Sequence, residues 1–136
     1  MPANDPRPAL EAALYSRLDG QLAVEVFNTQ APPETATPFV IFQEQAATHM
    51  HTFGTRNAGS DYVYAVKAIV EGWDPLPADN ISALIDAALD DGALSVTGFG
   101  VGQCRREADV TFNEVEPGGR AFSHRGGLYR IVLYPA

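Results

Sequence analysis

The sequence predicts an α+β domain in which a largely antiparallel sheet of about six strands carries two helices packed on one of its faces. Three observations support this fold class. Apolar residues alternate with period two in several segments, helical periodicity occurs in only two, and most connections are short and rich in turn residues. The length of 136 residues suits one domain with one core. We therefore expect a single domain over residues 1–136, with residues 1–7 as a loose N-terminal arm.

Two segments have the period of an amphipathic helix. The first, residues 8–18, opens with Pro8, whose missing N–H costs nothing at a first helical position, and contains leucines at a spacing of four. The second, residues 81–89, follows Asp79 and Asn80, either of which is a suitable N-cap. Its periodicity predicts one buried face, formed by Ile81, Leu84, Ile85, Ala88 and Leu89.

Strand character is found at residues 24–27, 39–45, 61–71, 94–99, 108–115 and 128–134. The third of these segments is the clearest, because Tyr62, Tyr64 and Val66 lie on one side and Ile69 lies on a second apolar side. Two helices on one sheet face leave the other face free. Apolar side chains are costly to leave in water, at about 25 cal/mol per Å², so the sequence favours assembly with further copies of the chain.

Residues 46–60 have neither period and are predicted to form a long polar loop. A loop of about 15 residues is longer than compact domains usually need, which indicates a function or an intermolecular contact. A mobile hairpin tip with incidental side chains is the simpler alternative. The candidates for contact with another subunit in this segment are His49, Met50, His51, Phe53 and Arg56.

The charge is strongly acidic, with nine Lys or Arg against 17 Asp or Glu and a formal net charge of −8. The excess falls in residues 1–100, which carry a net charge of −9. This balance opposes general affinity for nucleic acid, because such binding depends on neutralising phosphates with basic side chains. One interpretation is a solvated acidic surface, and the other is a face that repels a polyanion or meets a basic partner.

The cysteine count and the hydropathy of the sequence exclude further classes of protein. Cys104 is the only cysteine, so an intramolecular disulfide and a cysteine-rich zinc site are both ruled out. No segment approaches the roughly 20 apolar residues that span a bilayer, and the first residues lack the pattern of a signal peptide. We expect a soluble, non-exported protein without membrane contact.

No catalytic constellation is evident in the sequence. His49, His51 and Asp61 are the conceivable ligands of a small metal-dependent hydrolase, but two histidines on a polar loop are usually solvated, and the spacing fixes no third ligand. Cys104 and His124 lie in no nucleophile motif. We predict no catalytic, cofactor-binding or metal-binding residues and no enzymatic activity.

The C-terminal third contains a group of arginines. Cross-strand pairing with nearby acids is one interpretation, and a salt-bridging face toward the acidic side of a neighbouring copy is the other. The candidates for such an interface are Arg105, Arg106, Arg120 and Arg125.

The order and spacing of the elements resemble those of the tail terminator, or tail completion, family of long-tailed bacteriophages and related gene transfer agents. The resemblance covers most of the chain, while residues 107–127 and Trp73 do not align with the pattern. The matching features are the opening helix with Ala9-Leu10, the proline and apolar strand of 38–42, the strand 62–70, the helix ending Ala88-Leu89-Asp90, the short strand at Leu94 and the glycines that precede the final strand in 126–130.

The resemblance implies a non-enzymatic ring, commonly of six subunits, that caps the last ring of the tail tube, stops its polymerisation and presents a docking surface for the head connector. Strand and hairpin edges would join neighbouring subunits, and repeated symmetric contacts favour a closed ring. The expected sheet-face and ring-closure residues are Tyr62, Tyr64, Val66 and Ile69. DNA would pass through the lumen without specific binding, and the acidic excess would suit a lumen that repels phosphates.

The expected location is therefore the tail of a virion or virion-like particle, assembled in the host cytoplasm. The alternatives are another neck or tail component, such as a head completion (stopper) protein or the tube subunit itself.

Overall fold

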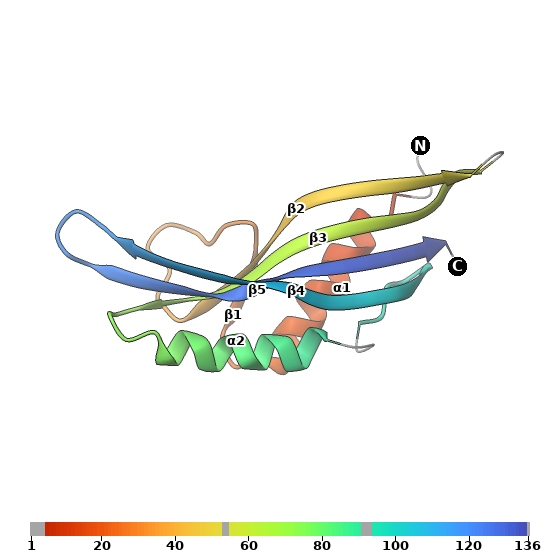
Figure 1. Ribbon diagram of the computed structural model, residues 1–136. Helices are drawn as coiled ribbons and strands as arrows, with labels where there is room; N and C mark the ends of the chain where they lie inside the picture. The colour runs from red at the N-terminus through yellow and green to blue at the C-terminus, as the bar shows by residue number, and fades with distance from the viewer. Residues whose placement is uncertain (1–4, 53–54, 91–93, 136) are drawn as a thin grey trace.

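The computed structural model describes residues 5–52, 55–90 and 94–135, and gives only the course of the backbone where strands pass through 51–58. These residues form two helices and a five-stranded sheet (Figure 1). The elements are α1 (Arg7–Gln21), β1 (Glu25–Asn28), β2 (Phe39–Thr52), β3 (Thr55–Glu71), α2 (Leu76–Leu89), β4 (Phe99–Val115) and β5 (Ala121–Pro135).

The α+β class is confirmed, with one correction to the number of strands. The sheet order is β1-β2-β3-β5-β4, in which β1 runs parallel to β2 and every other neighbour is antiparallel. Five strands replace the six expected because residues 94–99 form no strand of their own. That segment makes one isolated bridge, between Val96 and Phe99, before β4 begins.

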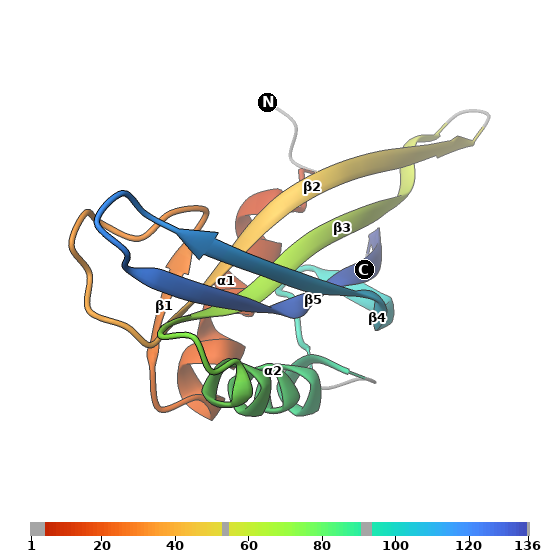
Figure 2. The ribbon, with the colours of Figure 1, turned by 60° about the vertical axis from the view of Figure 1, so that its left-hand side comes forward.

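Both helices pack on the same side of the sheet, as expected (Figures 1 and 2). Two tyrosine hydroxyls mark this helix-facing side, since Tyr64 donates to Glu11 Oε2 on α1 over 2.9 Å and Tyr129 donates to Asp86 Oδ1 on α2 over 3.0 Å. The core between the layers is formed by fully or almost fully buried side chains, among them Leu10, Leu14, Leu18, Val40, Phe42, Tyr62, Tyr64, Val66, Ile85, Leu89, Tyr129, Ile131 and Leu133.

The predicted loop of residues 46–60 is instead part of a long hairpin. β2 continues to Thr52 and β3 begins at Thr55, with register maintained from Phe39–Ile69 out to Met50–Gly59. The loop prediction was wrong because the outer half of this hairpin is held by backbone pairing between polar residues, which leaves no hydrophobic alternation in the sequence. A register shift between Glu44 and Ala46 also breaks the period.

Helix α2 begins five residues before the predicted start. It is preceded by Pro75 without a side-chain cap, and the Leu76 N–H donates to Asp74 Oδ1 over 3.0 Å. Asp79 therefore lies inside the first turn and is not the N-cap. The predicted apolar face is correct except at Leu84, which is 54% exposed.

Two hairpins reach beyond the helical layer in opposite directions. Figure 1 shows the β2–β3 hairpin extending past α1 on one side, while the β4–β5 hairpin extends past α2 on the other. The β4–β5 turn contains Gly118 and Gly119, both with positive φ, a conformation that glycine adopts without strain. The sheet is therefore much longer than the helices that cover it.

A pair of glycines in β5 allows a close approach of three segments. A Cβ at Gly126 would overlap the backbone carbonyl oxygen of Val66 on β3, and one at Gly127 would overlap the Arg106 side chain on β4. These are the glycines that precede the apolar part of the final strand. Their lack of a side chain is a packing requirement at both positions.

Candidate assembly surface

The sheet face opposite the helices is apolar and carries no helix. We call it the free face. The strand registers place alternate residues of four strands there, since Val63, Ala65 and Ile69 of β3 stand beside Arg130, Leu128 and His124 of β5. The apolar members of the free face include Phe39, Ile41, Val63, Ala65, Ile69, Val110, Phe112, Phe122, Leu128 and Val132.

The free face is only partly shielded by its own side chains. Ile41 and Ile69 are nearly buried, and Phe112 is 53% exposed with its ring edge-on to the His124 ring at 5.1 Å. Farther along, the Tyr134 ring lies against the positions where Gly59 and Gly102 have no side chain. A half-exposed apolar sheet of this kind is suited to an intermolecular contact.

The charged groups on the free face divide into paired and unpaired. Arg130 lies 3.2 Å from Asp61 Oδ2 and 2.9 Å from Glu107 Oε1, so one guanidinium is shared by two carboxylates. Lys67 and Arg105 have no ion pair among the residues that the structure describes. Burial lowers the pKa of Lys67, which is half-buried between apolar neighbours. Lys67 and Arg105 are therefore the cations of this face that could pair with an acid of another molecule.

The four arginines predicted for an interface have different surroundings. Arg106 turns toward α2, where it donates to Ser82 Oγ over 3.0 Å and to the Tyr129 hydroxyl over 3.1 Å. Arg125 also lies on the helix-facing side, 3.3 Å from an Asp79 carboxylate oxygen. These two residues hold α2 against the sheet.

The other two arginines are accessible to a partner. Arg120 pairs with Glu71 at 3.0 Å beside the β4–β5 turn. Arg105 is exposed on the free face. Adjacent residues of one strand, Arg105 and Arg106, thus serve opposite faces of the sheet, as strand alternation requires.

The residues predicted near the β2–β3 tip are spread over both faces. His49 lies on the helix-facing side, with Nδ1 2.9 Å from Ser60 Oγ and its ring edge-on to Tyr62 at 6.0 Å. Met50 lies on the free face against Gly59. Phe53 and the side chains of His51 and Arg56 lie outside the described residues.

This geometry does not assemble the metal site of the hydrolase alternative. Asp61 binds Arg130 on the free face, whereas His49 points to the helix-facing side, so the two cannot share an ion. Among the side chains that the structure describes, no three His, Cys, Asp or Glu residues lie together in a group that could hold a metal ion. In the same described part, no helix is long and apolar enough to cross a membrane.

Cys104 and His124 are likewise separated. Cys104 is buried on the helix-facing side opposite Ile131, and burial raises the pKa of its thiol to about 12. His124 lies on the free face, where Nε2 is 3.0 Å from Glu114 Oε1. Burial lowers the pKa of His124. The thiol is thus held protonated and on the opposite face of the sheet from His124.

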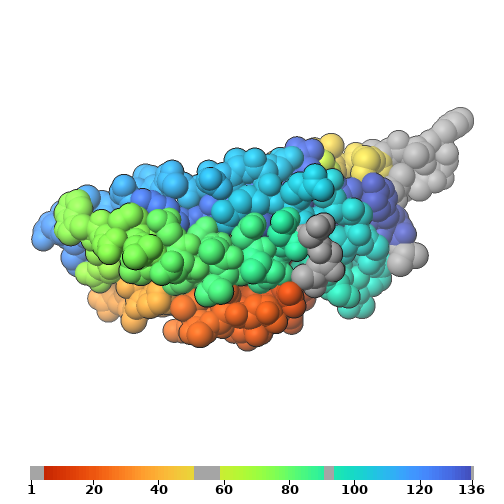
Figure 3. All heavy atoms as spheres, turned by 60° about the horizontal axis from the view of Figure 1, so that its bottom comes forward, coloured from red at the N-terminus to blue at the C-terminus, as the bar shows by residue number. Residues whose placement is uncertain are grey.

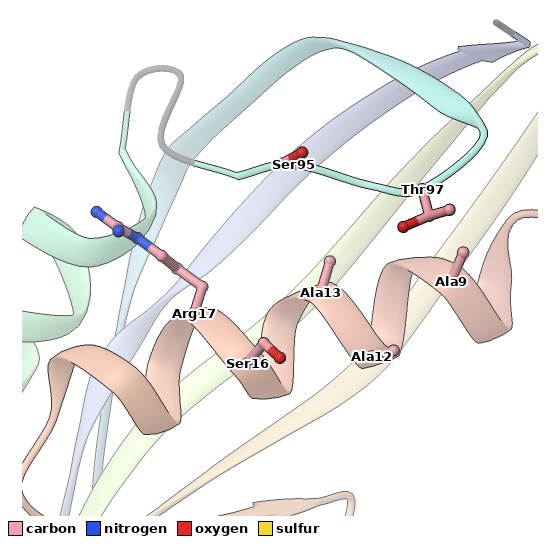
Figure 4. Close-up of a pocket in the computed structure, with 7 residues that line it drawn as sticks. All are labelled: Ala9, Ala12, Ala13, Ser16, Arg17, Ser95 and Thr97. Carbon is pink, nitrogen blue, oxygen red and sulfur yellow. The ribbon is translucent and has the colours of Figure 1, made fainter.

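An open hollow of about 450 Å³ lies between α1 and the segment before β4 (Figure 4). Arg17 at its end donates Nε to the Ala88 carbonyl over 2.8 Å, which ties α1 to α2. The walls present methyl and hydroxyl groups and contain no acid–base pair. The lining residues are Ala9, Ala12, Ala13, Ser16, Arg17, Ser95 and Thr97.

Sequence reasoning missed one surface, the exposed row of Trp73, Leu76 and Leu84, which we call the α2 stripe. The two leucines lie eight residues apart on one face of the helix, and Trp73 precedes them. Figure 3 shows α2 on the outside of the helical layer. The spacing of Leu76 and Leu84 was available in the sequence, but the helix was predicted to begin after Leu76.

No family model matches the sequence, and no curated protein matches it. Two solved structures are similar along nearly the whole chain. One is described as "Virion of native gene transfer agent (GTA) particle", with a TM-score of 0.70, 15% identity, and coverage of 97% of this chain and 99% of that chain. The other bears no functional name and gives a TM-score of 0.60, 18% identity, and coverage of 96% and 95%. At these identities the comparison shows a shared fold.

Proposed function

We propose that this protein is a structural component of a phage-like or gene transfer agent tail, and specifically a terminator. Copies of the chain form a ring on the last ring of the tail tube, stop its polymerisation and provide the docking surface for the head connector. The observation that carries the proposal is the free face, an apolar surface without a covering helix, in a fold that matches a chain of a GTA virion over almost its full length. The protein is then assembled in the host cytoplasm and resides in the particle.

The mechanism consists of complementary surfaces rather than chemistry. Identical copies joined by one repeated contact close into a ring when the rotation between neighbours divides a full turn, and six copies are expected from the resemblance. One side of the ring matches the growing end of the tube. The other side offers tube subunits no matching surface, so growth ends there.

Two regions are proposed to contact other subunits, the tube or the connector. The first is the outer half of the β2–β3 hairpin, which extends beyond the helices and includes His49, Met50, His51, Phe53 and Arg56. The second is the β4–β5 hairpin with Arg105 and Arg120. Arg106 and Arg125 contribute indirectly, because they position α2.

The lumen is proposed to lie along the edge formed by α1 and β1. Asp19 and Glu25 on this edge are exposed and have no basic partner among the described residues. Acids at the lumen surface repel phosphates and let DNA pass without binding. A particle structure with a strongly basic bore would contradict this assignment.

Tube assembly in the presence of the purified protein tests the proposed function. A terminator added in increasing amounts to polymerising tube subunits shortens the tubes, and electron microscopy finds it at their ends. Lengthened tubes that incorporate the protein would identify a tube subunit instead. Unchanged tubes together with binding to the head connector would identify a head completion or stopper protein.

A further inference from the structure

The α2 stripe is a second exposed apolar surface, on the opposite side of the molecule from the free face. Trp73 is 75% exposed, Leu76 58% and Leu84 54%. α2 packs against β3 and β5 through its other side, so these three side chains contribute nothing to the core. Single apolar residues on a surface are common, but three large ones in one row, including a tryptophan, are typical of a contact surface.

Acidic side chains follow one flank of this stripe. Asp79, Asp86 and Asp90 are spaced by seven and four residues, which places them along one side of the helix. Arg125 lies 3.3 Å from Asp79, and Arg106 lies 3.5 Å from Asp86. Asp90 is exposed at the helix end and has no basic partner in the described part of the chain. Asp74, beside Trp73 at the other end of the helix, is also exposed without an ion pair to a described residue, so acidic charge is available to a partner at both ends of the stripe.

The free face has the complementary charge. Arg105 is exposed there and has no ion pair to any described residue. Lys67 lies between apolar neighbours and also has no ion pair to a described residue. Of the acids of this face, Asp61 and Glu107 share Arg130, and Glu114 Oε1 lies 3.0 Å from His124 Nε2. Arg105 on the free face and Asp90 beside the α2 stripe are thus exposed charges of opposite sign, each without an ion pair among the described residues.

We infer that the free face of one copy docks on the α2 stripe of the next copy, with the apolar side chains at the centre and Arg105 facing the acidic flank at Asp90. The inference rests on the proposed function, because it specifies the contact that closes the ring. The two surfaces differ and lie on opposite sides of one chain. The contact is therefore heterologous, because each copy uses its stripe toward one neighbour and its free face toward the other, and such a contact closes into a ring when the rotation between neighbours divides a full turn.

Charge reversal at the two positions tests the contact. Arg105→Glu or Asp90→Lys alone places like charges together at every contact of the ring. Each is expected to raise the protein concentration needed for half-assembly at least tenfold, measured by native mass spectrometry. Both positions are exposed, and a cation at a helix C-terminus is favourable, so circular dichroism should show folded chains.

Mixing the two single variants makes the test specific. In a ring where they alternate, each contact joins either the two introduced charges or the two original ones, and both combinations are complementary. Equal amounts are expected to form rings with an even number of copies at the wild-type concentration. The chain carrying both substitutions is expected to assemble as well.

Truncation of the stripe tests its apolar part. Trp73→Ala is expected to weaken assembly at least tenfold. Tyr15→Ala is the matched control, because Tyr15 is an exposed aromatic residue on the other helix, at 46%. The control is expected to assemble like the wild type.

The outcomes separate this inference from the proposed function. Rings of unchanged stability from Arg105→Glu or Trp73→Ala, or a mixture that stays unassembled, would overturn the inference while tube capping by the wild type stands. Rings that persist in Trp73→Ala but no longer cap tubes would assign the stripe to the tube subunit and also overturn it. A wild-type chain that neither assembles nor caps tubes would contradict both the inference and the proposed function.

Discussion

At the scale of single residues, environment rather than residue type decides the role. Arg105 and Arg106 are chemically identical neighbours, yet one is exposed on the free face and the other bonds the backbone and side chain of Ser82 on α2. Gly126 and Gly127 are likewise identical residues next to each other. Gly126 lies against backbone atoms, whereas Gly127 lies against a side chain. Residue type alone distinguishes neither pair, and the strand register distinguishes both.

The sharpest prediction at this scale concerns Gly126. Gly126→Ala is expected to lower the free energy of unfolding by about 1–3 kcal/mol, because the added methyl group meets the Val66 carbonyl and the Lys67 backbone, which cannot move aside without breaking the β3–β5 pairing. Chemical denaturation of the monomer measures the change. Gly100→Ala is the control, since nothing lies closer than 4.0 Å to its Cβ position. Equal stability of the two variants would contradict the packing described for β5.

At the scale of elements, α2 depends on polar contacts as well as on its buried face. Arg106 joins β4 to this helix through Ser82 and Asp86, and its guanidinium lies over the Tyr129 ring at 5.3 Å. The absence of a side chain at Gly127 makes room for it. Arg106 therefore acts together with Arg125 and the buried face of α2 in fixing the position of this helix.

Removing this side chain should loosen the helix. Arg106→Ala is expected to cost about 1–3 kcal/mol of unfolding free energy, since charge-assisted hydrogen bonds are lost at a largely buried site. Arg105→Ala, one residue away, should change it by no more than about 0.5 kcal/mol when measured on the monomer. Thermal melts at low protein concentration compare the two. A cost as large for Arg105→Ala would show that the faces have been assigned wrongly.

Elements with a clear hydrophobic period were predicted correctly from the sequence. The prediction failed where only backbone pairing between strands determines the structure. The inner strand of 61–71 and the buried side of α2 were predicted correctly, because Tyr62, Val66 and Ile85 repeat at the period of their element. Residues 46–60 have no such period, since partner strands determine their conformation. The α2 stripe was missed because exposed apolar residues look like part of a core until the helix boundaries are known.

At the scale of the whole molecule, both faces of the sheet are apolar but only one is covered within the chain. The helix-facing side contains fully buried residues such as Val66, whereas Ala65 beside it on the free face is half-exposed. The chain therefore has more apolar surface than its two helices can cover. The free face carries cations without an ion pair among the described residues, and the helical side carries acids. The two apolar surfaces are therefore better suited to contact each other than to contact copies of themselves.

A matched pair of substitutions separates folding from assembly. Val66→Asp is expected to abolish the folded state, because an unpaired buried charge costs several kcal/mol against a total stability of about 5–15 kcal/mol. Ala65→Asp should leave a folded monomer that no longer assembles, with circular dichroism and native mass spectrometry as the two readouts. If the Ala65→Asp variant assembled like the wild type, the free face would not be a contact surface. A normal melting temperature for Val66→Asp would contradict the core.

The seam between β3 and β5 joins parts of the chain that are far apart in sequence, as in the pairs Ser60–Leu133 and Glu71–Phe122. The β2–β3 and β4–β5 hairpins can form from local contacts, whereas this seam requires closure of a long loop and is expected to form later in folding. Val63 and Leu128 on either side of the seam become neighbours on one surface only then. An incompletely folded copy therefore has no continuous free face to present to another molecule.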